Sequence, residues 1–312
     1  MPGRPLHAPT GASAGLIGAA IAVTAWGASG VVAKWLTMGA LAIVTYRFGA
    51  YAVIIGASRA IRNQPLTKAA FVASIPGGLW LAADVALFFT AIKLTTVVNA
   101  TMIGSLQPLV LTLYGVRFLG EKVMRRDVAL GAVALAGAIV IVLAGSSSGE
   151  GNIWGDLAAV GALASWSTYF VIAKDVNARV SPTDFTISTA IIVAVTNAPL
   201  ALLFGQSLAW PTLPEWGWLL LMALGAGVLG HNLMNWSLPR IALWLGSTFT
   251  LFVPVVSSAL AWAFLDEPLV AMQIIGMAIT VFALAMLVYF QQSDTSRAAA
   301  AVDAPEILAD SS

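Results

Sequence analysis

The sequence predicts an all-α, polytopic membrane protein whose ten transmembrane helices form two inverted five-helix repeats around a central cavity. Of its 312 residues, 59% are apolar and only 9% are charged, and the mean hydropathy is +0.90. An ordinary soluble domain carries about 25% charged residues. Apolar runs of about 20 residues recur along the chain, which is the length that a ~30 Å hydrocarbon layer demands of a helix.

An internal duplication supports this architecture. Pro108 and Glu121 recur as Pro254 and Glu267, with a common shift of 146 positions. The segments 26–34 and 166–174 also match, each beginning with Trp and ending with Lys, at a shift of 140 positions. Each repeat holds five predicted spans, and because five is odd, the second repeat must enter the membrane upside down relative to the first.

The repeats divide the chain into five parts. Residues 14–144 form the first five-helix repeat and residues 155–290 the second, joined by a periplasmic linker at 145–154. Residues 1–13 and 291–312 have little apolar content and are expected to be disordered tails, because they cannot bury enough surface to order.

The spans follow from hydropathy in chain order. The first is too long, and too clearly echoed by the sixth, to be a cleaved signal peptide. The predicted spans are residues 14–37, 41–61, 70–93, 96–119, 127–144, 155–174, 184–204, 214–237, 242–265 and 270–290.

Loop charges predict the orientation of the bundle. Basic residues collect in the connections after the second, fourth and sixth spans, whereas Ser146–Ile153 and Gln206–Trp218 contain none. Positive residues gather on the cytoplasmic side of membrane proteins. Both termini are therefore expected in the cytoplasm.

Several function classes are disfavoured by what the sequence lacks. It has no cysteine and only two histidines, His7 and His231, so neither a thiolate nor a histidine-rich metal site is expected. No phosphate-cradling Gly-x-x-x-x-Gly-Lys-Ser/Thr segment occurs, so neither a nucleotide cofactor nor ATP-driven pumping is expected. We expect no nucleic-acid partner. An intramembrane enzyme is disfavoured because Asp84 with His231 is too sparse a set for catalysis.

Two ionisable residues inside the spans are candidates for function. Asp84 is the only acidic residue in the middle of a span, and His231 is the only mid-span histidine. The 146-position shift places Asp84 opposite Gly230, beside His231. Ionisable groups in hydrocarbon usually face a cavity or a partner. They are predicted to line the central path, where they would bind a charged substrate or relay protons; alternatively, each hydrogen-bonds within the bundle to fix helix packing.

Paired tryptophans provide the most specific aromatic signal. Trp26 and Trp166 stand at matching points of the two repeats, and aromatic walls suit aromatic or flat cationic substrates. The alternative is that such tryptophans anchor the protein at the membrane interface or face lipid. The side chains predicted to bind substrate are Trp26, Trp80, Asp84, Phe88, Asn99, Gln107, Trp166, Tyr169, His231, Asn235, Trp244 and Thr248.

The duplicated prolines and glutamates have separate interpretations. Pro108 and Pro254 are predicted hinges because proline can kink a helix, although they could instead simply shape the bundle. Glu121 and Glu267 stand at helix ends near water, so capping or loop contacts explain them better than a direct role in transport.

The ten spans, the repeated Pro-to-Glu spacing and Tyr46-Arg47-Phe48 resemble the drug/metabolite transporter superfamily, in particular its EamA-type members. The second half departs from this pattern, with Thr186 opposite Tyr46 and Ile187 opposite Arg47. The aromatic richness is similar to that of the YddG-type aromatic amino-acid exporters.

This resemblance implies a multi-pass exporter of the bacterial-type inner membrane. Its partners would be the lipid bilayer and a small-molecule substrate, most simply an amino acid, with aromatic ones preferred and flat cationic drugs a further class. Export would occur by alternating access at a midplane cavity. A passive facilitator or channel is the alternative, although nothing in the sequence resembles a selectivity filter. A monomer is assumed.

Overall fold

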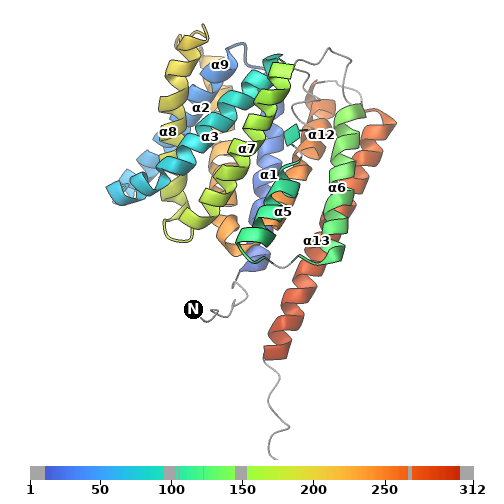
Figure 1. The fold of residues 1–312 in the computed structure, drawn as a ribbon. Coiled ribbons are helices and arrows are strands. Elements are labelled where there is room, and N and C mark those ends of the chain that lie inside the picture. Colours follow the sequence, from blue (N-terminus) through green and yellow to red (C-terminus); the bar gives the residue numbers. More distant parts are fainter. Residues whose placement is uncertain are drawn as a thin grey trace, which may run out of the picture.

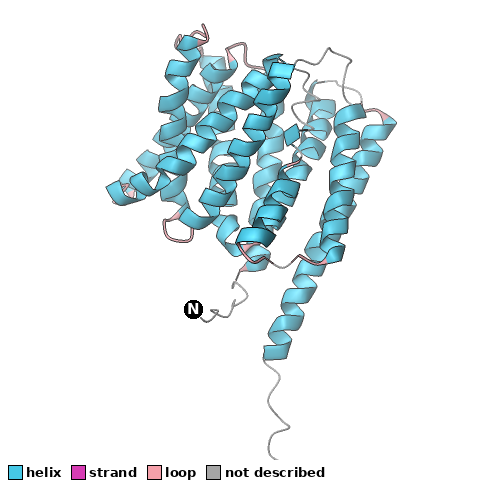
Figure 2. Cartoon of the chain, in the orientation of Figure 1, coloured by secondary structure: helices cyan, strands magenta, loops and turns pink. Residues whose placement is uncertain are grey.

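The computed structural model describes residues 11–94, 103–104, 106–121, 123–144, 153–265 and 269–302. Every regular element in these ranges is a helix (Figures 1 and 2). Seven helical segments are long and apolar enough to cross a membrane, and Leu243–Val256 is a shorter apolar helical stretch. The predicted class, an all-α polytopic membrane protein, is therefore confirmed.

The helices follow the predicted spans closely. The first half contains α1 (Ala12–Lys34), α2 (Ala40–Ile61), α3 (Lys68–Leu94), α5 (Gln107–Phe118) and α6 (Arg125–Ala144). The second half contains α7 (Ile153–Val176), α8 (Pro182–Leu203), α9 (Leu213–Met222), η1 (Ala223–His231), α10 (Asn232–Ser237), η2 (Leu238–Arg240), α11 (Leu243–Thr248), η3 (Phe249–Phe252), α12 (Val253–Leu265) and α13 (Ala271–Val302). The predicted span 96–119 lies partly outside the described residues.

The C-terminal helix corrects one prediction. α13 continues past Phe290 to Val302, so the expectation of a disordered tail beginning at residue 291 is wrong for residues 291–302. Alanine, the best helix former, fills much of this extension. Arg126 of α6 also pairs with Asp294 and places its guanidinium carbon 4.6 Å from the Phe290 ring centroid. α6 and α13 stand side by side at the edge of the bundle (Figure 1).

Local capping explains where two second-half helices begin. Ser181 Oγ accepts a hydrogen bond of 3.2 Å from the Asp184 backbone N–H at the start of α8. At the start of α9, the Thr212 N–H donates to Glu215 Oε2 over 2.7 Å. The N–H groups at the start of a helix have no hydrogen-bond partner within the helix. Side-chain oxygens such as these accept their hydrogen bonds and so stabilise the first turn.

Two second-half crossings are interrupted. Between α9 and α10 the chain forms the π-helix η1, and between α11 and α12 it forms the 3-10 turn η3. π-helical turns are rare and often occur at functional sites. The sequence pattern did not predict these interruptions.

The packing places α1 and α7 at the centre of the bundle. α1 packs against η1, α10 and α12, while α7 packs against α3 and α5. α2 and α8 pack together on one side, and α6 with α13 on the other (Figure 1). The largest fully buried side chains are aromatic and come from α2, α7 and α8: Phe48, Tyr51, Tyr169, Phe170 and Phe185.

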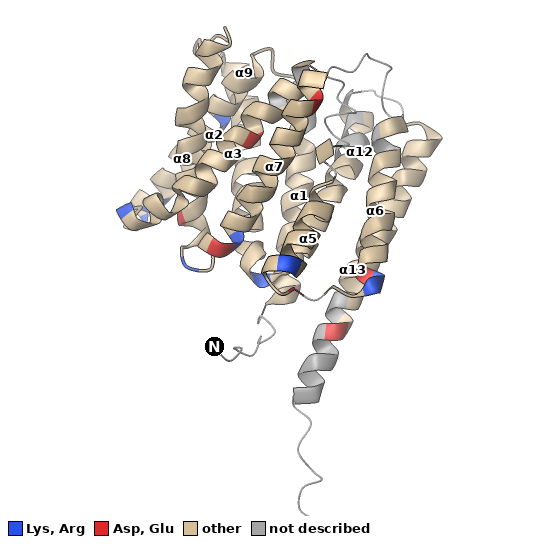
Figure 3. Ribbon diagram, viewed as in Figure 1, with Lys and Arg blue, Asp and Glu red and all other residues tan. Residues whose placement is uncertain are grey.

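The two ends of the bundle differ in their content of basic residues. The basic residues of the described part gather toward one end of the helices (Figure 3), and α1 begins and α13 ends at that same end (Figure 1). Near the opposite end of α2, the Tyr46 ring lies 5.8 Å from that of Trp216 and 6.2 Å from that of Trp210. Aromatic side chains typically mark a membrane interface.

Candidate functional site

An aromatic cluster forms where α1, α7 and η1 meet. The ring centroids of Trp26 and Trp166 lie 5.4 Å apart in an edge-to-face arrangement. Trp166 also stacks on Tyr169 at 5.3 Å and contacts Phe170 at 4.7 Å. Each such aromatic pair contributes about 0.5–1.5 kcal/mol beyond its buried area. The two tryptophans at matching repeat positions therefore contact one another across the halves.

The π-helix η1 supplies the polar side of this cluster. Its wider turns run between i and i+5, and the Ala226 carbonyl accepts a 3.2 Å hydrogen bond from Trp26 Nε1. His231, only 6% exposed, has its ring 5.3 Å from that of Trp26 and 5.5 Å from that of Phe48. A Cβ on Gly230 would collide with the Trp26 indole, so glycine is needed where this indole packs.

A buried hydrogen-bond chain adjoins the aromatic cluster. The Tyr169 hydroxyl donates to Asn235 Oδ1 at 3.1 Å, and Asn235 Nδ2 donates to Thr186 Oγ1 at 3.0 Å. All three side chains are at most 1% exposed. Satisfied polar networks of this kind rigidify a core, and this one joins α7, α8 and α10.

The three predicted residues of α3, Trp80, Asp84 and Phe88, have different surroundings. Asp84 and Phe88 are partly buried, and Asp84 interacts electrostatically with Tyr169 of the cluster. None of the ion pairs between described residues involves Asp84. Trp80, one turn earlier, is 42% exposed. These three residues therefore extend from the interior near α7 toward the outer surface.

The predicted residues of α5 and α11 have polar contacts apart from the aromatic cluster. Gln107, 1% exposed, accepts a 3.2 Å hydrogen bond from the Thr250 hydroxyl. Thr248 donates to the Trp244 carbonyl one turn earlier at 2.8 Å, and both are buried. Among the described residues, no hydrogen bond or ring contact joins these side chains to Trp26 or Trp166. Asn99, the remaining predicted residue, lies outside them.

Both repeated prolines stand at the beginning of a helical segment. Pro108 lies in the first turn of α5, and Pro254 follows the first residue of α12, after the 3-10 turn η3. A proline in the first turn sacrifices no helical hydrogen bond, because that N–H would have no partner. The two copies thus mark equivalent helix starts, and their role as hinges stays a prediction.

Glu121 confirms its predicted role as a capping residue. Its carboxylate accepts the backbone N–H groups of Leu243 at 2.8 Å and Trp244 at 3.4 Å, at the start of α11. Lys174 Nζ lies 3.3 Å from Glu121 Oε1. This single carboxylate therefore joins the chain after α5 to α7 and α11. Glu267 lies outside the described residues.

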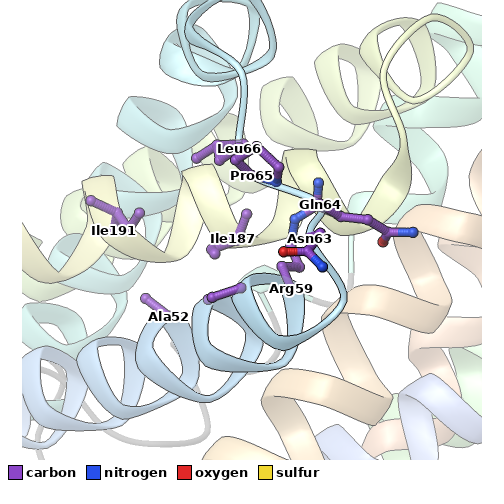
Figure 4. Close-up of a pocket in the computed structure, with 10 residues that line it drawn as sticks. Ala52, Arg59, Asn63, Gln64, Pro65, Leu66, Ile187 and Ile191 are labelled. Carbon is purple, nitrogen blue, oxygen red and sulfur yellow. The ribbon is translucent and has the colours of Figure 1, made fainter.

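Two cavities lie along the contact between α2 and α8, away from the aromatic cluster. The first has a volume of about 540 Å³. Figure 4 shows Arg59, Asn63 and Gln64 on one side of it and Ile187 of α8 on another. The second, about 570 Å³, is almost wholly apolar. Both are open grooves on the outer side of these helices, whereas the aromatic cluster at the centre is closely packed.

One charged residue near the cluster was not among the side chains predicted to bind substrate, although the sequence marked it as a difference between the repeats. Arg47 of α2 places its guanidinium carbon 5.1 Å from the Phe48 ring centroid, and Phe48 contacts His231. Its position inside an apolar span was the available signal, because ionisable residues at such depth usually have a function. Across the described residues, no three His, Cys, Asp or Glu side chains gather as metal ligands.

Comparison with known proteins places this geometry in a family. "Uncharacterized transporter YyaM" of Bacillus subtilis (strain 168) is 25% identical over 245 residues, which cover 76% of this chain and 80% of that protein. "Aromatic amino acid exporter YddG" of Ancylobacter novellus is 32% identical over 155 residues, which cover 48% of this chain and 52% of the exporter.

The fold has a counterpart among solved structures. One crystal structure matches with a TM-score of 0.77 at 19% identity, covering 90% of this chain and 99% of that chain. The sequence pattern of the EamA-like transporter family matches residues 13–143 and again residues 153–289. The chain therefore belongs to the EamA-like transporter family of the drug/metabolite transporter superfamily.

Proposed function

We propose that this protein is a secondary transporter that exports small organic solutes, with amino acids as substrates and aromatic ones preferred. The observation that carries the proposal is the contact of Trp26 with Trp166 beside His231, where the two family repeats meet. Planar walls with a polar group between them suit a substrate that has both a ring and charge. One relative bears the name of an aromatic amino acid exporter.

The helix packing supports an inverted repeat of ten crossings. In the repeat alignment α1 corresponds to α7, α3 to η1 and α10, and α5 to α12. The contact of α3 with α7 therefore has its counterpart in the contact of η1 and α10 with α1, and the contact of α5 with α7 in that of α12 with α1. The pairs α2–α8 and α6–α13 map onto themselves. In transporters built this way, the substrate site lies at the repeat interface and is typically formed by interrupted helices. η1 is such an interruption.

The orientation belongs to the same proposal. The end of the bundle where basic residues gather (Figure 3) faces the cytoplasm, which puts the start of α1 and the end of α13 on that side of a bacterial-type inner membrane. One chain holds both repeats, so a monomer suffices. The close packing of the central cluster favours a carrier that must open alternately to each side over a channel with a standing pore.

Counterflow in proteoliposomes tests the proposal. Liposomes loaded with unlabelled tryptophan should accumulate labelled tryptophan, phenylalanine and tyrosine faster than labelled alanine, with no chemical change. Trp26→Ala and Trp166→Ala should slow aromatic uptake more than alanine uptake, by about fivefold or more if each removes a ring contact of at least ~1 kcal/mol. Trp154→Ala, at an exposed helix end, is the matched control.

Other outcomes separate the alternatives. Equal rates for tryptophan and alanine in the wild type would remove the aromatic preference. Uptake without acceleration by internal substrate would favour a passive facilitator, and a modified product would indicate an enzyme. Repeating the assay with a pH gradient, and with flat cationic drugs as substrates, determines proton coupling and substrate range.

A further inference from the structure

The face of α2 that packs toward η1 carries a partly buried cation, Arg47, without a paired anion among the described residues. Arg47 lies seven residues after the start of α2, about 10 Å along the helix at 1.5 Å per residue. Its Nε atom is buried and has no hydrogen-bond partner. None of the ion pairs between described residues includes Arg47. Buried charges are normally paired and hydrogen-bonded.

Two further buried groups beside Arg47 also lack a partner. The Tyr51 hydroxyl, one turn along α2, and His231 Nδ1 form no hydrogen bond. Tyr51 approaches Thr186 without reaching hydrogen-bond geometry, and it interacts electrostatically with Arg47. Most buried polar atoms in proteins are hydrogen-bonded, so three unsatisfied groups in one place require an explanation.

The positions of these residues bring the three groups to one site. Phe48 connects them, since the Arg47 guanidinium lies over its ring and His231 packs 5.5 Å from it. Gly227 of η1 lies against Tyr51, where a Cβ would come within 3.0 Å of the ring. The three unsatisfied groups therefore occupy the contact between α2 and η1.

We infer that Arg47, Tyr51 and His231 form an anion subsite that receives the carboxylate of the substrate. The inference rests on the proposed function and extends it. A guanidinium and a phenol are donors, and an imidazole nitrogen can be one, and the planar fork of arginine matches a carboxylate with two parallel hydrogen bonds. Trp26 also contacts His231, so the ring of the same substrate would lie among the tryptophans.

The competing explanation is that Arg47 only stacks on Phe48. A cation–π contact would satisfy the face of the guanidinium but none of its N–H groups, which lie in its plane. It would also leave Tyr51 and His231 without partners. The carboxylate accounts for all three groups together.

Ligand-induced thermal stabilisation of the purified full chain in detergent tests the subsite. The probes are tryptophan, tryptamine, which lacks the carboxylate, and indole-3-propionate, which lacks the amine, together with alanine and ethylamine. Wild type should bind the carboxylates more tightly than the matching amines. Arg47→Gln should weaken binding of the carboxylates about tenfold or more, corresponding to the loss of a charge-assisted hydrogen bond, and leave tryptamine binding unchanged.

Controls keep failure of the subsite distinct from failure of the proposed function. Arg59→Gln removes another arginine of α2, one already paired with Asp184 at 2.6 Å, and should leave carboxylate binding unchanged. If alanine binds as tightly as tryptophan and both depend on Arg47, the subsite stands and the aromatic preference fails. If tryptamine binds wild type as tightly as tryptophan, or no carboxylate binds, the subsite is refuted.

A second variant covers the case in which Arg47→Gln does not fold. Tyr51→Phe deletes one hydroxyl without changing the ring that packs against Gly227. It should weaken carboxylate binding several-fold while leaving tryptamine binding unchanged, because one neutral hydrogen bond is lost. Carboxylate binding equal to wild type in Tyr51→Phe would overturn the assignment of its hydroxyl to the subsite.

Discussion

Removing the carboxylate of Glu121 should weaken the contacts that hold α5, α7 and α11 together and so lower the stability of the fold. Glu121 accepts the N–H groups of Leu243 and Trp244 and lies 3.3 Å from Lys174 Nζ. Its side chain is 12% exposed and that of Lys174 is 23% exposed, so water screens this ion pair less than a surface pair. The same carboxylate therefore acts both as the cap of α11 and as a counter-ion.

The structure separates these two contributions. Loss of an N-terminal cap costs about 1 kcal/mol, within a range of about 0.5–2, and a partly exposed ion pair contributes roughly another 1 kcal/mol. Lys174 keeps the carbonyls of Ile241 at 2.6 Å and Leu238 at 3.4 Å, so it is not left without partners. We expect Glu121→Ala to cost about 2 kcal/mol and Glu121→Gln, which keeps an acceptor for the amides, about 1 kcal/mol.

Thermal unfolding of the purified protein in detergent, monitored by circular dichroism, measures both effects. Each kcal/mol should lower the midpoint temperature by a few degrees. A double-mutant cycle with Lys174→Met isolates the ion pair. Arg179→Met is the control, because its ion pair with Asp175 is 69% exposed on both sides and should contribute little. Equal losses for Glu121→Gln and Glu121→Ala would refute the capping contribution, and strict additivity with Lys174→Met would refute the coupling.

Two further substitutions test packing and capping elsewhere. Gly230→Ala drives a Cβ into the Trp26 indole, so it should lower the free energy of unfolding by about 1–3 kcal/mol through overpacking and slow tryptophan counterflow. Gly225→Ala is the control, because Gly225 faces open space on the same π-helix. Equal behaviour of the two variants would contradict the predicted contact. Gln206→Leu removes the carbonyl oxygen that accepts the first N–H groups of α2, at 2.8 and 3.3 Å, and should lower the unfolding midpoint as a lost cap of about 1 kcal/mol. Gln64→Leu, in the exposed loop after α2, should leave the midpoint unchanged, and a Gln206→Leu midpoint equal to wild type would show that this cap is not needed.

Hydropathy predicted most crossings because apolar length is a local property of the chain. The helices α1, α2, α3, α7 and α8 end within about four residues of their predicted bounds. The repeat shift also matched Trp26 with Trp166, which the structure brings into contact. Both results follow from residue type and spacing alone.

The sequence did not predict the features that depend on contacts between distant segments. A π-helical turn keeps an apolar segment apolar, so the hydropathy of the crossing that contains η1 is unchanged, whereas the faces of Gly227 and His231 are rotated relative to an α-helix. The sequence marked Arg47 as part of a family pattern and as a difference between the repeats, but its contact with Phe48 and the lack of a counter-ion appear only in three dimensions. The extension of α13 is contacted by Arg126, which is distant in the sequence.

The differences between the repeats have a physical reason if the substrate is an amino acid. A site with true two-fold symmetry would present the same groups to both ends of a bound molecule, and could not distinguish a carboxylate from an ammonium group. Asp84 stands opposite Gly230 in the repeat alignment, and Arg47 has an aliphatic counterpart. Asp84 approaches the aromatic cluster from α3 through Tyr169, and Arg47 approaches it from α2 through Phe48. An acidic and a basic side chain thus reach the cluster from different helices, which is the asymmetry that recognition of a zwitterion would require.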